Sequence, residues 1–170
     1  MNFFEAQNIS KAILKYLARK PSRRLARFDL SWSLKLHREM FGDVWVWAGE
    51  TRKSNKNFGV HWEQVAPMLF ALMNDLASWS NFQMELAEQA VWLHHRAVQI
   101  HPFENGNGRW SRLLANIWLK RHGQSIVEWP ETRVGTESTI RAEYLDAIQQ
   151  VNGGKNDALR QLRERYTPSN

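Results

Sequence analysis

The segment from His101 to Arg112 holds the residues best suited to chemistry. Gly106 and Gly108 form a glycine-rich turn, and such a turn at the start of a helix gathers unpaired N–H donors at the positive end of the helix dipole. Arg109 and Arg112 are three residues apart, so both guanidinium groups can reach anionic oxygens from one face of the first turn. His101 precedes the turn, and an imidazole with a pKa of about 6.5 suits a general base. The pattern predicts transfer of a phosphate-containing group to an acceptor that His101 deprotonates.

Two predicted helices hold this segment between them. Apolar residues recur at helical spacing over 86–100 and again over 113–119, and Gly123 supplies a stop for the second helix. Pro102 disfavours the helical conformation for His101, so the first helix should end there. We therefore expect a loop between two helices, with the active residues at 101–112.

The string resembles the Fic motif, His-x-Phe-x-(Asp/Glu)-Gly-Asn-Gly-Arg-x-x-Arg. The positions that agree are His101, Phe103, Gly106, Asn107, Gly108, Arg109 and Arg112. The chain is therefore identified as a member of the Fic/Doc family. The resemblance implies an all-α, Fic-fold helical domain with a short β-hairpin flap near the active site. It also implies a protein nucleotidyltransferase that transfers AMP from ATP to a Ser, Thr or Tyr hydroxyl of a target protein.

The resemblance also implies a role for each motif position. His101 would be the catalytic base, and Phe103 would be a buried anchor for the loop. The remaining positions would bind nucleotide phosphates, with an anion hole from the first three and contacts to the outer phosphates from the last two: Gly106, Asn107, Gly108, Arg109 and Arg112.

One motif position departs from the family pattern. The family places an acidic Mg²⁺ ligand fifth in the motif, whereas this chain has Asn105 there and its carboxylate, Glu104, one residue earlier. Mg²⁺ prefers carboxylates together with substrate phosphates, so Asn105 is a weak metal candidate for Mg²⁺ or Mn²⁺. Three outcomes are open: a weaker metal site, another phosphate-containing donor, or a phosphate-binding interaction module without turnover.

The segment over about 44–60 is similar to the region that forms the flap beside a Fic active site. Its turn-forming composition favours short β-structure, and an exposed edge there could hold the target backbone as an added strand. The candidate target-binding residues are Ser54, Asn55, Lys56 and Asn57. Together with Leu93-His94-His95-Arg96, this region most resembles the subfamily called mobile mystery protein B. That resemblance implies a mobile-element, toxin–antitoxin-like pair with a separate antitoxin or helix-turn-helix companion.

Composition sets the outer bounds. The chain has 170 residues, which we expect to form one domain over 1–170. There is no cysteine, no apolar run of about 20 residues and no secretory signal core, so we expect a cytoplasmic protein without membrane contact. The net charge of +6 favours a soluble basic surface, and nucleic-acid binding is not favoured because the basic N-terminal cluster lacks a DNA-binding signature.

Apolar periodicity predicts the other helices over 3–19, 30–41, 61–79, 136–151 and 156–166. Asp29 is a plausible N-cap for the second of them. The adjacent His94 and His95 point about 100° apart on a helix, which favours a buried structural role over a metal site with His101. Only Thr139 and Glu143 approach the spacing of the family's inhibitory helix, and we interpret this as a chance match, which leaves inhibition to a separate chain or a segment outside this sequence.

Overall fold

The computed structural model describes residues 3–79, 84–127, 157 and 161. Five helices are assigned within them: α1 (Phe3–Leu17), α2 (Leu30–Phe41), α3 (Trp62–Trp79), α4 (Leu86–Ile100) and α5 (Asn107–Arg121). The expected helices over 136–151 and 156–166 lie outside these residues, except that Asp157 and Gln161 are both helical. The predicted helices over the described part of the chain are confirmed, and α5 begins at Asn107, before the apolar run over 113–119.

Local sequence explains where the helices start and stop. Asp29 is the N-cap of α2, and its side chain accepts a hydrogen bond from the Trp32 N–H at 2.7 Å, as predicted. Asn55 accepts a hydrogen bond from the Trp62 N–H at 3.0 Å, so a residue of the preceding loop satisfies a donor at the start of α3. Gly123 follows α5 with φ +80°, the left-handed conformation that ends a helix.

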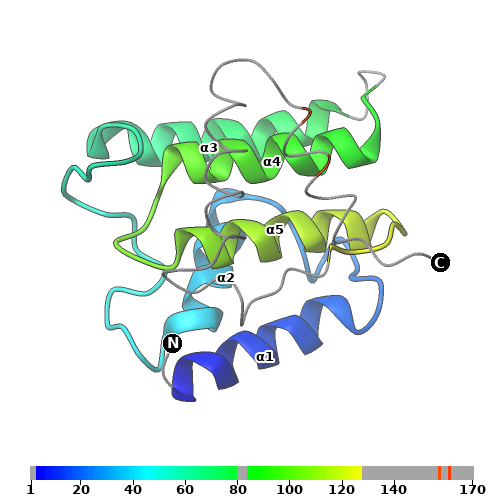
Figure 1. The fold of residues 1–170 in the computed structure, drawn as a ribbon, viewed down its shortest axis with the longest axis horizontal. Coiled ribbons are helices and arrows are strands. Elements are labelled where there is room, and N and C mark those ends of the chain that lie inside the picture. The colour runs from blue at the N-terminus through cyan, green and yellow to red at the C-terminus, as the bar shows by residue number, and fades with distance from the viewer. Residues whose placement is uncertain (1–2, 80–83, 128–156, 158–160, 162–170) are drawn as a thin grey trace.

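Helix α5 is the centre of the fold. It packs against α4, α1 and α2, while α3 packs against α4 and α2 (Figure 1). Eleven of its fifteen residues are buried, so nearly its whole circumference is covered by other elements. None of the helices in the described part of the chain is long and apolar enough to cross a membrane.

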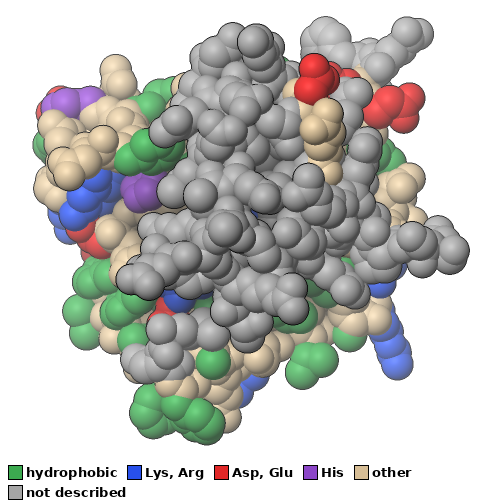
Figure 2. Space-filling model, viewed as in Figure 1, with side chains coloured by type: hydrophobic (Ala, Val, Ile, Leu, Met, Phe, Trp, Pro, Cys, Tyr) green, Lys and Arg blue, Asp and Glu red, His purple; other side chains and the backbone are tan. Residues whose placement is uncertain are grey.

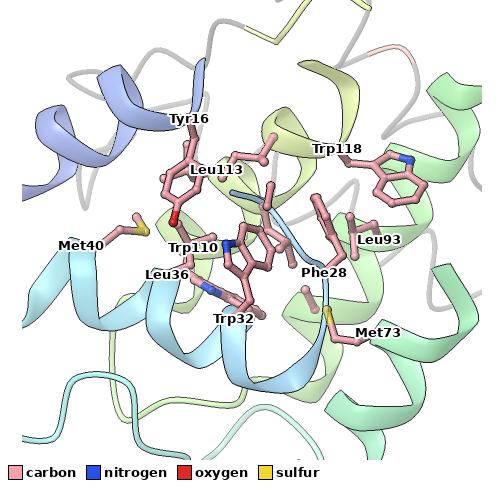
Figure 3. Close-up of a cluster of buried hydrophobic side chains, with 14 of the residues drawn as sticks. Tyr16, Phe28, Trp32, Leu36, Met40, Met73, Leu93, Trp110, Leu113 and Trp118 are labelled. Carbon is pink, nitrogen blue, oxygen red and sulfur yellow. The ribbon is translucent and has the colours of Figure 1, made fainter. Parts of the chain in front are cut away.

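Aromatic side chains fill the core around α5. Figure 3 shows Trp110 of α5 between side chains of α1 and α2, near Tyr16, Trp32 and Leu36. Trp110 is fully buried, and its indole N–H donates to the Ser33 carbonyl at 3.1 Å. Because Trp110 directly follows the arginine of the motif, this anchor fixes the start of α5 relative to α2.

The expected β-hairpin over 44–60 is not confirmed, since these residues are all described and form turns and bends without a strand. The first half is a series of tight turns, in which backbone N–H groups of 44, 45, 48 and 50 bond to carbonyls three or four residues back. In the second half, the carbonyls of Ser54 and Val60 accept from the buried Arg52 side chain. Side-chain donors thus take carbonyls that a neighbouring strand would otherwise use. We call residues 53–60 the α2–α3 loop below.

Candidate active site

His101 closes helix α4 in a conformation that few residues other than glycine adopt. It is the C-cap of α4 with φ 51° and ψ 61°, in the left-handed region. Pro102 excludes the helical conformation for this residue, as predicted, and the left-handed turn directs the chain into the motif loop. Backbone strain of this kind persists only where neighbours hold it, and here it places the imidazole beside the α2–α3 loop.

The α2–α3 loop covers one side of the imidazole. The Phe58 ring stands edge-on to the His101 ring, with centroids 5.4 Å apart. Gly59 has φ +103°, and a Cβ on it would lie 2.6 Å from the His101 Cβ, so only glycine permits this approach. Burial lowers the pKa of His101, and the positive charges of Arg52 and Lys56 lower it further, while the Val98 carbonyl opposes them. The imidazole is therefore held neutral, the form that can accept a proton.

The motif loop is braced from inside. Phe103 is fully buried, as expected of an anchor, and its ring stacks on His37 with centroids 3.6 Å apart. The Asn107 side chain accepts from the Phe103 N–H and donates to the Phe103 carbonyl, each at 2.8 Å. Both the amide oxygen and the amide nitrogen of the Asn107 side chain are thus engaged with the loop. The side chain therefore shapes the site, and the backbone N–H lies at the start of α5.

Gly106 allows the backbone to begin α5 tightly. Gly106 is the N-cap with φ 80°, and a Cβ on it would meet the Phe41 ring at 2.7 Å. The Trp110 N–H bonds to the Gly106 carbonyl at 2.9 Å, which is the first turn of the helix. The N–H groups of Asn107 and Gly108 have no helical carbonyl behind them, which is the arrangement that binds anions.

The two motif arginines contact different neighbours. Arg109 forms an ion pair with Glu5 of α1, and its guanidinium lies 5.0 Å from the Phe41 ring centroid and 5.7 Å from that of Trp45. Arg112 is buried beside α4, where burial and then the Arg112 charge lower the pKa of His94 to about 3. His94 and His95 are both buried on α4.

Residues of the α2–α3 loop are exposed and close to the motif. Lys56 forms an ion pair with Glu104, and the Ser54 hydroxyl lies 3.4 Å from a Glu104 carboxylate oxygen. Asn55 caps α3, and Asn57 is exposed. The loop runs beside the turn from α4 to α5 at the left of Figure 1, and Figure 2 shows lysine, arginine and histidine side chains gathered on that side of the molecule.

Asn105, at the fifth motif position, and the neighbouring Glu104 do not fit a metal ion held by the protein. The Asn105 side-chain oxygen accepts from the Gly106 N–H at 2.7 Å, and the nearby Glu104 carboxylate is engaged by Lys56. Within the described residues, no group of three or more His, Cys, Asp or Glu side chains could hold a metal ion.

The matched family is the Fic/DOC family, over residues 27–119, which is more than half of the chain. The chain belongs to the Fic/DOC family. Among curated Fic relatives, a protein adenylyltransferase Fic of Aedes aegypti is 33% identical over 148 residues, covering 84% of this chain and 28% of the relative. The protein adenylyltransferase VbhT of Bartonella schoenbuchensis is 31% identical over 130 residues, covering 69% of this chain and 27% of the relative. This chain therefore spans little more than a quarter of each.

Solved Fic structures share the fold. Residues 134–508 of Fic-1 from Caenorhabditis elegans superpose with a TM-score of 0.78 at 25% identity, covering 95% of this chain and 47% of that one. BepC from Bartonella tribocorum, solved with bound AMPPNP, superposes with a TM-score of 0.72 at 19% identity, covering 98% and 86% of the two chains. The Fic fold is confirmed, and it is all-helical over the described residues.

Three residues of the site escaped the sequence analysis: Glu5, His37 and Arg52. Glu5 carried a signal, because it precedes Ile9, Ala12 and Tyr16 at helical spacing and therefore belongs to the buried face of α1. His37 carried the same kind of signal, because it is at helical spacing from Ser33 and Phe41 on the buried face of α2. Arg52 carried none, since an arginine in a polar loop resembles a surface residue.

Proposed function

We propose that this Fic-family protein is a protein adenylyltransferase that transfers AMP from ATP to a hydroxyl group of a target protein. The observation that carries the proposal is the juxtaposition of a neutral, half-enclosed imidazole with a helix start that binds anions. His101 and the first turn of α5 are only a few residues apart, and a buried, hydrogen-bonded loop fixes their separation. The names of the relatives support the same activity.

The reaction follows from this arrangement. The target hydroxyl oxygen attacks the α-phosphorus of ATP, and the bond between that phosphorus and the oxygen leading to the β-phosphate breaks, releasing pyrophosphate. The hydroxyl proton passes to His101, whose Nδ1 is enclosed by protein and so leaves Nε2 as the acceptor. The N–H groups at the start of α5 and the charges of Arg109 and Arg112 stabilise the negative charge on the phosphates and on the departing pyrophosphate.

We propose that the α2–α3 loop receives the target. Its residues 53–59 are exposed, and they lie against both His101 and Glu104. Ser54, Asn55, Lys56 and Asn57 would meet the target backbone at a distance from which its hydroxyl can reach the imidazole. A cytoplasmic location and a separate inhibitory companion also belong to this proposal, and they rest on composition and on the subfamily resemblance.

One observation favours an alternative. With Asn105 bonded to Gly106 and Glu104 bonded to Lys56, the site lacks the carboxylate that the family pattern assigns to Mg²⁺. A donor other than ATP, or phosphate binding without turnover, accounts for that difference. The proposed reaction attaches AMP to a hydroxyl group of a target protein. The alternative attaches a different phosphate-containing group or leaves the hydroxyl group unmodified.

Intact-mass analysis tests the proposal. The pure protein is incubated with ATP and Mg²⁺ or Mn²⁺, with and without bacterial lysate, beside a His101→Ala variant. We expect a protein that gains the mass of one AMP with the wild type and none with the variant. A gain of one phosphate would keep the site and change the reaction. No gain in any protein would refute AMP transfer from ATP and favour the alternative.

A further inference from the structure

Arg52 is a buried arginine whose side chain binds only backbone oxygens among the described residues. It is 2% exposed, and it donates to the carbonyls of His101 and Ser54, each at 2.7 Å. It also donates to the carbonyls of Val60 and Ile100. An arginine that is removed from water needs all of these partners, because an unsatisfied buried charge is strongly unfavourable. The fork geometry of the guanidinium makes several bonds in different directions possible at once.

These four carbonyls belong to two segments that are far apart in the sequence. Ser54 and Val60 mark the two ends of the α2–α3 loop, whereas Ile100 and His101 are the end of α4. The Arg52 N–H adds a fifth link, to the Pro102 carbonyl at 2.9 Å. The last carbonyls of a helix have no helical donor and lie at the negative end of its dipole, so a cation is favourable there. A single side chain thus fastens the loop to the backbone of His101.

Charged groups from two neighbouring segments surround His101. Arg52 and Lys56 face it from the α2–α3 side, and Glu104 of the motif loop pairs with Lys56. Burial is the largest cause that lowers the pKa of His101, and the Arg52 charge comes next. Arg52 therefore acts on His101 in two ways, through the carbonyl that it holds and through its charge.

We propose that Arg52 is a positioning residue that holds the target-receiving loop and His101 together as one unit. The proposal rests on the proposed function, in which the α2–α3 loop receives the target and His101 takes the proton of its hydroxyl. If the loop and His101 moved independently, a docked hydroxyl would only rarely lie within reach of the imidazole. Because Arg52 binds both segments, the position of one segment fixes the position of the other.

Two substitutions separate the two effects of Arg52. Arg52→Gln removes the charge and most of the donors, whereas Arg52→Lys keeps the charge as a single point and loses the fork. The matched control is Arg38→Gln, because Arg38 is an exposed arginine that donates to the Ala48 carbonyl at 3.2 Å, just before the loop, and has no bond to α4. A thermal melt of each variant establishes that it is folded.

Two measurements require neither ATP nor a target. NMR titration of the His101 ring gives its protonation midpoint, and native-state trypsin digestion gives the cleavage rate at Lys56–Asn57 in the exposed loop. For Arg52→Gln we expect a higher His101 midpoint and cleavage about tenfold faster, since several hydrogen bonds are lost. For Arg52→Lys we expect the faster cleavage with a midpoint near that of the wild type. Arg38→Gln should match the wild type in both.

The outcomes separate this proposal from the proposed function. A wild-type midpoint and a wild-type cleavage rate in Arg52→Gln would overturn the positioning role, even if the wild type transfers AMP. If Arg52→Gln does not fold, Arg52→Lys decides, and unchanged cleavage in it would overturn the role. The expected changes in a protein that modifies nothing would support the link between loop and His101 and refute AMP transfer alone.

Discussion

Acid should destabilise this protein well above the pH at which its carboxylates are protonated, because two histidines are buried in neutral form. Burial lowers the pKa of His37 from its ordinary value of 6.5 to about 4, with the Asn105 carbonyl opposing that shift. Burial, with the charges of Arg112 and His95, lowers the pKa of His94 to about 3. In the unfolded chain both histidines titrate near 6.5, so between that pH and the folded values the unfolded state binds more protons.

The direction and size of the change in stability follow from this difference between the folded and unfolded pKa values. A depressed pKa in the folded state means that stability is fully present above pH 6.5 and is lost as the pH falls toward 4. For His37 the free energy of unfolding should fall by about 2 kcal/mol between pH 7 and pH 5, and His94 should add a similar amount. Because a domain of this size is stable by only about 5–15 kcal/mol, the combined loss is a large fraction of the total.

The structure also shows what protonation of His37 would break. The Gly49 N–H donates to His37 Nδ1 at 3.0 Å, so the hydrogen is on Nε2, which donates to the Asn105 carbonyl at 3.1 Å. A proton on Nδ1 removes the first bond and places a charge against the stacked Phe103 ring. The loss therefore falls first on the bond between α2 and the turn at Gly49, whereas the bond from Nε2–H to the Asn105 carbonyl is kept.

Urea unfolding at pH 7, 6 and 5 provides the test. We expect His37→Gln to lower stability at pH 7 and to reduce the loss between pH 7 and pH 5 by about 2 kcal/mol relative to wild type. The same substitution at the exposed His61 controls for the removal of a histidine. An unchanged loss in His37→Gln would show that His37 does not hold its depressed pKa in the folded state, and the reasoning would be wrong.

Two further predictions concern the motif loop. Gly106→Ala should lower the free energy of unfolding by roughly 2–4 kcal/mol, because a Cβ there meets the Phe41 ring at 2.7 Å and φ is +80°. The control is Gly123→Ala, which has the same φ and nothing within 4 Å and should cost only about 1 kcal/mol. Equal losses in urea unfolding would exclude the contact with Phe41 as the cause. Asn105→Glu should raise Mn²⁺ affinity in the presence of ATP, measured by calorimetry, because it returns a carboxylate to the fifth motif position. An unchanged Mn²⁺ affinity would show that the fifth motif position does not contribute to metal binding.

The sequence predicted the helices well because their signals are local. Asp29 caps α2 through its own side chain, and Pro102 with Gly106 defines the loop between α4 and α5 whatever packs around it. The flap prediction failed in its secondary structure because Arg52 takes the carbonyls of Ser54 and Val60, which no local pattern reveals. Local chemistry sets where the chain turns, and the donors that occupy its backbone carbonyls decide whether a turn-rich segment becomes a strand.

The candidate site also combines residues that the motif predicts with residues that only the fold brings near. Motif spacing predicted His101 and the glycines as site residues, yet the groups that set their properties come from α1, α2 and the segment over 52–60. Glu5 engages Arg109, so the positive charge at the start of α5 is partly balanced within the protein, and an incoming phosphate must compete with or add to that ion pair. The affinity for an anion at this site therefore depends on a residue about a hundred positions away, and the motif alone could not have predicted it.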